Sequence, residues 1–568
     1  MNTFSGLLFP KENVPVHTLS DTALHDLGMD SIIKKVAEKE EERAYMLKVL
    51  SGMTDDPEVI RYRIDIFQDI YEHPEIREKL VGILGKISFL RDFGSFRKNS
   101  DEESTVWDLM HRLSEIRDYI RLVEAFYEVL SETPLQSKGL LDLRDYVAGI
   151  YEERGFAELR ADIEEIHLSA KEVKSLTVGI NLNERFEAES IGLVSVNGKH
   201  FTKAGVIGRF AKKMGKTEEI AESTEWEKRM HYLEVTPSGT AEAALERVYK
   251  ASTASSQPFL ARSIGMTGVP EGDATKGITH YMGRVTDRMI SLTVRKLREV
   301  LNRYVTITIT DITKLIPEFL YYIRFAEHIE ALREKGFRFC KAEILPQEDP
   351  RTMEAHGMYN MKLASLNPGM AEEIVPNDLT LRGDSPVCIL TGANRGGKTT
   401  FTQGIGLLFL LSGGGIFVPG DRFLFKPADR ILTHFPADED KTMDLGRLGE
   451  ECSRFRELFR ESTENSLLLL NETFSTTSFE EGYYIAKDAI RALLLKGVRT
   501  VYNTHMHKIA EDCTKEPDPE TGRKAVSLVT KTEGTKRSFR IIEAPPEGLS
   551  YAEDIAKKYG VTYDMLTE

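Results

Sequence analysis

The 568-residue sequence contains only four cysteines, and no two of them form a C-x-x-C pair. They are Cys340, Cys388, Cys452 and Cys513. Cysteines this far apart in the sequence support neither a disulfide framework nor a cysteine-based zinc site. The N-terminal stretch MNTFSGLLFPKENVPVH also lacks the basic start and the long apolar run of a signal peptide. These absences predict a protein of the reducing cytoplasm.

Long apolar runs and excess positive charge are missing as well. The apolar stretch GIGLLFLLSGGGIFV is too short to cross a membrane and is interrupted by glycines. Lysine and arginine number 75 against 90 aspartates and glutamates, which gives a net charge of -15. A nucleic-acid contact would therefore need a local basic patch, because the molecule as a whole is acidic. At this length we expect several domains.

Helical patterns occupy two separate parts of the sequence. Residues 1–175 place apolar side chains three and four positions apart, with charged residues between them. Asp56 followed by Pro57 is a typical helix start, because aspartate caps free N–H groups and proline fits the first turn. The pattern returns over residues 266–369, where we expect Pro317 to kink or break a helix. These parts predict a helical core rather than a catalytic site.

Residues 176–265 interrupt the helical pattern and predict a small mixed insertion, like the tip of a lever. Apolar residues alternate from Leu176 to Leu182, as in a strand. The marked basic cluster of this acidic protein follows, and its basic residues are Lys199, Lys203, Arg209, Lys212, Lys213 and Lys216. Two interpretations stay open for this cluster: contact with nucleic-acid phosphates, or a charged face that is simply solvated.

After residue 369 the sequence alternates between short apolar runs and helical or looping segments. The runs SPVCILTG, DRILTHF, NSLLLLNE and RTVYNTH have the length and composition of buried strands. Buried strands separated by helices are typical of a parallel sheet. We therefore predict an α/β nucleotide-binding domain over residues 370–568.

A glycine-rich stretch follows the first of these runs. GANRGGKT fits the pattern G-x-x-x-x-G-K-[ST], with Gly392 and Gly397 at the glycine positions, and it lies between a predicted strand and a predicted helix. The glycines would let backbone N–H groups surround phosphates, Lys398 would neutralise phosphate oxygens, and Thr399 would ligate Mg²⁺. Asn394, Gly396 and Thr400 complete the predicted nucleotide-binding set. The flanking strand and helix argue against a chance match.

Two strand ends supply the remaining catalytic candidates. Glu472 follows the leucine run and is the predicted general base. Asn471 stands where a second acid would support Mg²⁺ through bound water. Its amide lacks the negative charge, so we expect Mg²⁺ to be held about tenfold more weakly while catalysis persists. His505 ends another run and is the predicted γ-phosphate sensor, although a histidine at a strand end is by itself more often structural.

These pieces, in this order, resemble the ATPase domain of the MutS family, a branch of the ABC-type ATPases. The resemblance covers residues 370–560 and rests on the segments VPNDLTLRGDSPVCILTGANRGGKTTF, ENSLLLLNETFSTTSFEEG, NTHMHKIAE and RSFRIIEAPPEGLSYAEDIAKKYGV. It implies a homodimer in which ATP and Mg²⁺ lie between protomers. It also implies that Gly446 and Arg447 at the signature position, and Thr477 and Ser478 in the following loop, face the partner's nucleotide.

The chain departs from the family pattern in ways that bear on function. Ile374 stands where the family stacks an aromatic ring on adenine, so we expect apolar packing on the base but no ring stacking. The helical pattern begins soon after Met1, which leaves no room for a mismatch-reading domain and a connector, and no nuclease tail is evident after the last helix. The family's nucleic-acid-binding clamp would correspond to the predicted insertion.

The sequence leaves two functions open. The first is an ATPase that acts as a nucleotide-switched clamp or sensor of duplex or branched DNA in repair or recombination. The second is a nucleotide-gated switch with slow hydrolysis that binds RNA, ribosomes or a protein partner, which Asn471 and the overall acidity favour. In both, a helical core with a clamp-like insertion precedes an ABC-type P-loop α/β domain, and no membrane is involved.

Overall fold

A computed structural model describes most of the chain. It covers residues 4–11, 13–87, 106–170, 175–182, 188–197, 266–267, 310–392, 396–436, 446–515, 517–533, 536–546, 557 and 559–567. Contacts divide the chain into two compact units, and the first contains residues 1–85, 126–147 and 314–568. The second unit contains residues 86–125 and 148–313. The domain boundaries expected from the sequence, after residues 175, 265 and 369, stay predictions.

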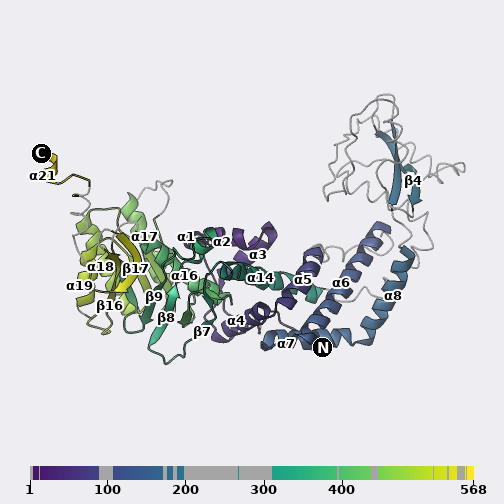
Figure 1. Cartoon of the computed structure of the whole chain (residues 1–568), viewed down its shortest axis with the longest axis horizontal. Coiled ribbons are helices and arrows are strands. Elements are labelled where there is room, and N and C mark those ends of the chain that lie inside the picture. Colours follow the sequence, from purple (N-terminus) through teal and green to yellow (C-terminus); the bar gives the residue numbers. More distant parts are fainter. Residues whose placement is uncertain are drawn as a thin grey trace. The chain divides into compact units, whose positions relative to one another are not determined.

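The first unit begins with helices, as the sequence predicts (Figure 1). They are α1 (Asp21–Leu27), α2 (Met29–Val36), α3 (Glu40–Ser51), α4 (Pro57–Glu72) and the greater part of α5 (Pro74–Ile87). The predicted start of α4 is confirmed: Pro57 is its first residue, and the Asp56 carboxylate accepts hydrogen bonds from the N–H groups of Glu58 and Val59. Two short strands, β1 (His17–Thr18) and β2 (Gly52–Met53), pair antiparallel beside these helices.

Helix α14 (Thr310–Arg333) runs through Pro317 without interruption, so the expected break does not occur, while the alternative of a kink stays a prediction. Proline removes one backbone hydrogen bond from a helix interior. Burial of the residues that follow offsets this loss, since Phe319 and Ile323 have no exposed surface. The ring of Phe319 packs against Phe126 of α6 (Val106–Glu132), with 5.0 Å between the ring centroids.

The second unit holds the greater part of α6, the end of α7 (Lys138–Tyr151), helix α8 (Arg154–Ala170) and a three-stranded sheet. Strand β3 (Ser175–Leu182) confirms the predicted strand; it pairs antiparallel with β4 (Ala188–Asn197), which also pairs with β5 (Met266–Thr267). The basic cluster predicted between residues 199 and 216 lies outside the described residues, so its two interpretations stay open.

The largest sheet of the described part has six strands in the order β13-β14-β15-β10-β16-β17. The strands are β10 (Val387–Thr391), β13 (Ile431–His434), β14 (Leu467–Asn471), β15 (Arg499–Asn503), β16 (Ala525–Glu533) and β17 (Lys536–Glu543). Neighbours pair in parallel except β16 with β17. The four predicted runs are thus confirmed as containing the parallel strands β10, β13, β14 and β15, and every residue of these four strands is buried.

Helices cover both faces of this sheet, which explains why its strands are apolar throughout. Leu468 and Leu470 of β14 belong to a core shared with α18 (Phe479–Lys496) and α19 (His507–Lys515), and residues of α17 (Gly446–Glu461) pack against this core. Leu469 points to the opposite face, where it contacts Gly406 of α16 (Lys398–Gly413). The α16 helix is therefore buried between the sheet and the N-terminal helices.

Shorter elements complete the first unit. A four-stranded sheet has the order β7-β12-β8-β9, with β7 (Ala342–Ile344), β12 (Arg422–Phe425), β8 (Arg351–Met358) and β9 (Asn377–Arg382). Strand β6 (Phe339–Cys340) pairs with β11 (Val418–Pro419), and α15 (Met361–Leu366) and α21 (Tyr563–Thr567) are short helices. Within the described ranges, no helix has the length and apolar character needed to cross a membrane.

We expect Asp69 to be a strong contributor to the stability of the first unit. Its carboxylate is 2% exposed and accepts hydrogen bonds from the backbone N–H groups of Gln136 (3.0 Å) and Ser137 (2.7 Å), just before α7. Replacing Asp69 by alanine leaves buried donors without an acceptor, so the free energy of unfolding should fall by about 2 kcal/mol. Urea unfolding followed by circular dichroism measures this, with exposed Asp145→Ala as the control; equal midpoints for both variants would contradict the assignment.

Candidate functional site

The carboxyl ends of three adjacent strands meet at one edge of the six-stranded sheet. Strands β14, β15 and β10 are neighbours and run parallel, so the residues that follow them emerge at the same edge. Gly392 follows β10, Glu472 follows β14, and His505 lies two residues beyond the end of β15. This edge is where open α/β sheets commonly bind ligands. The predicted catalytic residues are therefore brought together from segments far apart in the sequence.

The segment between β10 and α16 needs glycine at two positions. Gly392 and Gly397 have φ angles of 134° and 90°, which side chains other than hydrogen rarely allow. A Cβ atom at Gly392 would collide with the hydroxyl of Thr530 on β16. Gly397 precedes the first residue of α16, and among the described residues no side chain caps this end. A helix N-terminus favours a negatively charged group. Asn394 lies outside the described residues.

Lys398 opens α16 and brings a buried positive charge to the same edge. Its side chain is 6% exposed, and the ammonium group donates a hydrogen bond to the carbonyl oxygen of Gly392 at 2.9 Å. Burial lowers the pKa of Lys398, and the negative charge of Glu472 acts in the opposite direction. A buried cation at a helix N-terminus favours the binding of a negatively charged group.

The side chains of Thr399, Asn471 and Asn503 form a polar cluster at the same edge of the sheet. The Oδ1 atom of Asn471 accepts hydrogen bonds from the hydroxyl of Thr399 (3.1 Å) and from the amide group of Asn503. A carbonyl oxygen has two lone pairs, so these two donors fill the acceptor capacity of Asn471. The Oδ1 atom of Asn503 is buried, with no hydrogen-bond partner in the described part of the chain. The cluster fixes the position of the Thr399 hydroxyl oxygen.

Glu472 and His505 form a close pair next to the cluster. The Nδ1 atom of His505 lies 2.6 Å from Oε2 of Glu472. This hydrogen bond raises the pKa of His505, with desolvation opposing it. Glu472 has a φ angle of 52°, which is uncommon for any residue other than glycine and points to local strain. Its backbone N–H donates to the carbonyl oxygen of Asn503 at 2.8 Å, which ties the strained residue to β15.

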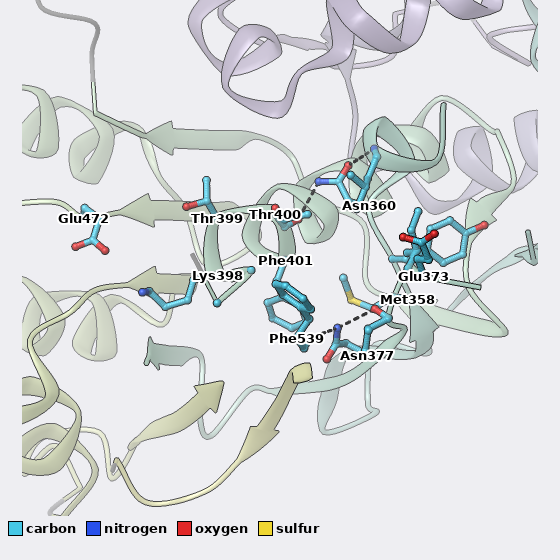
Figure 2. A pocket seen from close by; sticks show the side chains of 16 residues that line it. Met358, Asn360, Glu373, Asn377, Lys398, Thr399, Thr400, Phe401, Glu472 and Phe539 are labelled. Atoms are coloured by element: carbon cyan, nitrogen blue, oxygen red, sulfur yellow. Dashed lines mark hydrogen bonds between the residues drawn. The ribbon is translucent and has the colours of Figure 1, made fainter. Parts of the chain in front are cut away.

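A cavity of about 480 Å³ opens at this edge, a size that suits a nucleotide. Figure 2 shows Lys398 and Glu472 toward one side of the view and Met358 and Glu373 toward the other. The predicted residues that line it are Ile374, Gly396, Gly397, Lys398, Thr399, Thr400 and Glu472. His505 does not line the cavity itself but contacts Glu472, which does. The residues predicted to bind the phosphates and the residue predicted to pack on the base therefore line the same cavity.

Phe539 is a cavity residue that the sequence analysis missed. It comes from β17, lines the same cavity as Ile374, and has 45% of its surface exposed. The side chain of Asn377 holds its backbone: Nδ2 donates to the Phe539 carbonyl oxygen at 3.2 Å, and Oδ1 accepts from the Ile541 N–H at 2.7 Å. Residues 377 and 539 are far apart in the sequence, so no spacing signals that they meet.

Thr477 and Ser478 are not among the described residues that line the cavity formed by their own chain. Gly446 begins α17, and the side chain of Arg447 lies outside the described set. Ser478 caps α18 by accepting a hydrogen bond from the Glu481 N–H, and the Thr477 hydroxyl donates to the Glu481 carboxylate. Their local contacts are those of a helix start. The role facing a partner's nucleotide therefore stays a prediction.

The site offers protein oxygen atoms that could bind a metal ion. Among the described residues there is no group of three or more histidine, cysteine, aspartate or glutamate side chains that could hold a metal ion. Mg²⁺ commonly binds through one or two protein oxygens together with phosphate and water. The Thr399 hydroxyl, held by Asn471, is an oxygen ligand of this kind.

Comparisons with known proteins relate two parts of the chain to known families. A family model described as MutS domain V matches residues 388–565, and one described as the MutS2 N-terminal domain matches residues 55–335. The chain is 26% identical over 257 residues to "Endonuclease MutS2" of Thermus thermophilus, with 41% of this chain and 33% of that protein covered. It is 28% identical over 191 residues to "DNA mismatch repair protein MutS 2" of Halobacterium salinarum, with 33% and 21% covered.

A third relative, "DNA mismatch repair protein MutS" of Desulforamulus reducens, is 34% identical over 139 residues, with 24% of this chain and 16% of that protein covered. The chain thus spans a third or less of the length of these curated relatives. The two family models match separate parts of the chain: the described elements of one are mostly helices, and the other contains the glycine loop, Glu472 and His505. The chain belongs to the MutS family.

Proposed function

We propose that this protein is an ATPase that binds ATP in the cavity at the carboxyl edge of the six-stranded sheet. The observation that carries the proposal is the convergence on one edge of a glycine loop, a buried lysine, a held threonine hydroxyl and a carboxylate. Each of these groups has a task in phosphoryl transfer, where binding and charge neutralisation supply most of the catalysis. Membership of the MutS family supports the same activity.

The phosphates of ATP would bind between Gly392 and Thr399. The N–H groups at the start of α16 would donate to phosphate oxygens, and the Lys398 ammonium group would move from the Gly392 carbonyl to the phosphates. A phosphate offers Lys398 a stronger, charge-assisted hydrogen bond than the neutral carbonyl does. Burial disfavours the charged form of Lys398 before the nucleotide arrives, so bound phosphate would stabilise that form.

The Thr399 hydroxyl would hold Mg²⁺ together with the phosphates and water. The donor set fits, because Thr399 donates its proton to Asn471 and accepts a hydrogen bond of 3.5 Å from the Asn503 amide, which leaves one oxygen lone pair for the metal. When bound, Mg²⁺ neutralises charge on the phosphate oxygens. Asn471 then acts by orienting Thr399, since its own carbonyl oxygen is already occupied by Thr399 and Asn503.

Glu472 would act as the general base that orients and activates the attacking water. Its carboxylate lines the cavity and lies next to the lysine that holds the phosphates. His505 is hydrogen-bonded to this carboxylate and can respond to charge at the γ-phosphate. A rigid strand end and the backbone bond to Asn503 keep Glu472 in place, as an effective base requires.

The nucleobase would occupy the side of the cavity lined by Ile374, Met358 and Phe539. These residues give an apolar surface, and Phe539 adds an aromatic ring on β17. Ring stacking on the base, which Ile374 cannot supply, would then come from a residue distant in the sequence. The amide of Asn377 is occupied by backbone groups near Phe539, so it would hold the ring rather than read the base.

DNA is the proposed macromolecular partner, and a homodimer is the proposed functional state. The relatives are named as DNA mismatch repair proteins and as an endonuclease, and the first of these names supports DNA binding. In such a dimer, Gly446, Arg447, Thr477 and Ser478 would complete the partner's site. The basic residues between 199 and 216 would contact DNA phosphates in a clamp. ATP binding would close the dimer and hydrolysis would release it.

The first test is ATP turnover by the wild type and by Glu472→Gln. The amide keeps the shape of the side chain but cannot accept a proton, so turnover should fall by about 10²–10⁴-fold while ATP binding persists. Exposed Glu480→Gln, at the start of α18, is the matched control and should turn over like the wild type. Equal rates for wild type and Glu472→Gln would remove Glu472 from the proposed chemistry.

The same assay separates the DNA proposal from the alternative of an RNA- or ribosome-binding switch. Turnover is measured with duplex DNA, branched DNA, single-stranded DNA and ribosomes at two salt concentrations. The proposal expects stimulation by duplex or branched DNA that weakens with salt, because phosphate contacts release counterions. Stronger stimulation by ribosomes than by any DNA would select the alternative.

A second prediction concerns Asn471. Asn471→Asp places a negative charge against the Thr399 hydroxyl and the Asn503 amide, where charge-assisted hydrogen bonds replace neutral ones. The Mg²⁺ concentration that gives half-maximal turnover should therefore fall about tenfold. Asn13→Asp adds the same charge at an exposed position and should leave the Mg²⁺ requirement unchanged. An unchanged requirement in Asn471→Asp would show that Asn471 does not act on the metal.

A third prediction concerns pH. The hydrogen bond to Glu472 raises the pKa of His505 above its ordinary 6.5, so below that raised pKa the protonated imidazole occupies the Glu472 carboxylate. As pH rises through it, His505 loses its proton and Glu472 becomes available as a base. The value of kcat/KM for ATP should therefore rise with a pKa above 6.5, and His505→Ala should remove that limb. His73→Ala is the control; a profile that is the same in His505→Ala would refute the coupling.

A further inference from the structure

Asn503 is a buried polar residue at the end of β15, between the strands that carry the proposed site. Its backbone is level with Asn471 of β14 and with Leu390 of β10. Its carbonyl oxygen accepts a hydrogen bond from the Glu472 N–H at 2.8 Å, and the residue has no exposed surface. A buried amide costs free energy unless its polar atoms have partners, so the contacts of this side chain show what it does there.

The amide nitrogen of Asn503 has two acceptors in the polar cluster. Its Nδ2 atom donates to Oδ1 of Asn471 and, at 3.5 Å, to the hydroxyl oxygen of Thr399. The Oδ1 atom of Asn503 is buried, with no hydrogen-bond partner among the residues that the structure describes. Toward these residues, the Asn503 side chain therefore acts only as a hydrogen-bond donor.

This donor determines which end of the Asn471 amide faces Thr399. The two ends of a primary amide have similar shapes, but one is an oxygen that accepts and the other a nitrogen that donates. The Thr399 hydroxyl gives no preference by itself, because a hydroxyl can donate to an oxygen or accept from a nitrogen. If Asn471 alone turned its amide over, its nitrogen would face the nitrogen of Asn503 and their hydrogen bond would be lost. The contact with Asn503 therefore favours the orientation that the structure shows.

The orientation of Asn471 decides which partial charge faces the proposed metal ligand. Its Oδ1 atom is the negative end of the amide dipole and lies 3.1 Å from the hydroxyl oxygen of Thr399. A partial negative charge at this place favours a cation held by Thr399, whereas the amide nitrogen would oppose it. A carboxylate would present an oxygen in either orientation. Because Asn471 is neutral, its effect on a cation depends on being held one way round.

We propose that Asn503 is a positioning residue for Mg²⁺ binding: by donating to Asn471, it holds the carbonyl oxygen of that amide toward Thr399. This inference rests on the proposed ATPase function. Asn503 is not among the described residues that line the nucleotide cavity, so it acts through Asn471 and Thr399. Its loss should weaken the binding that depends on Mg²⁺, while the contacts of Lys398 and the start of α16 with the phosphates persist.

The test measures nucleotide binding rather than turnover. A fluorescent methylanthraniloyl derivative of AMP-PNP, an analogue of ATP that resists hydrolysis, is titrated in EDTA and at increasing Mg²⁺. Asn503→Leu keeps a similar size but removes the donor, so the Mg²⁺ concentration for half-maximal binding should rise about 3- to 10-fold, with binding in EDTA unchanged. Thr500→Val, which replaces another buried polar side chain of β15, is the control and should bind like the wild type. Asn503→Ala is the second variant if the leucine protein is poorly folded.

A second measurement separates positioning from a merely structural role. In an Asn471→Asp background, Asn503→Leu should change the half-maximal Mg²⁺ concentration by less than about twofold, because a carboxylate has no orientation to fix. Equal losses in both backgrounds would overturn the proposal, as would an unchanged or lowered Mg²⁺ requirement in Asn503→Leu alone. Failure of the ATPase proposal is distinguishable, since the wild type would then not bind the analogue or would bind it equally with and without Mg²⁺, and this inference would fall with it.

Discussion

The parallel register of three strands is the constraint on which the site depends. It sets Asn503 of β15 level with Asn471 of β14 on one side and with Leu390 of β10 on the other. From this one alignment, Asn471 meets both Asn503 and Thr399, and Glu472 meets the carbonyl oxygen of Asn503. A shift by one residue would turn each of these side chains to the opposite face of the sheet. Backbone hydrogen bonds thus set the positions of the polar groups.

Burial of the sheet keeps this register in place. Leucines on both faces of β14 pack against helices, with α16 on one face and α18 and α19 on the other. If β14 shifted by one residue along its neighbours, Asn471 or Ser466 would take the buried position of a leucine. The packing of the apolar core therefore also fixes the positions of the polar residues at the carboxyl edge of the sheet. At that edge, polar side chains replace apolar ones and are available to bind a ligand.

Sequence patterns predicted those parts of the fold that depend on local or repeating chemistry. Apolar runs identified β10, β13, β14 and β15, and the Asp-Pro pair at residues 56 and 57 identified the start of α4. The glycine pattern led to the loop before α16, because a phosphate site needs those residues at that spacing. Periodicity and motif spacing carry such information directly.

Contacts between distant segments were not predictable in this way. Nothing in the sequence pairs Asn377 with the backbone at Phe539, or Phe455 with Phe474 in the turn after Glu472, because each contact depends on how separate elements pack. Pro317 failed as a helix breaker for a related reason: the apolar residues beyond it are buried, and tertiary packing outweighs the lost hydrogen bond. The sequence predicted the residues at the carboxyl edge of the sheet, but not the contacts from other elements that position them.

The turn after Glu472 limits which residues can replace Gly482 on α18. Glycine in a helix costs up to about 1 kcal/mol relative to alanine. The Phe474 carbonyl oxygen occupies the space where a side chain would be. A descendant that replaced Gly482 to strengthen the helix would have to open the turn and move Glu472. A substitution of Gly482 that stabilises α18 would therefore displace the turn that positions Glu472.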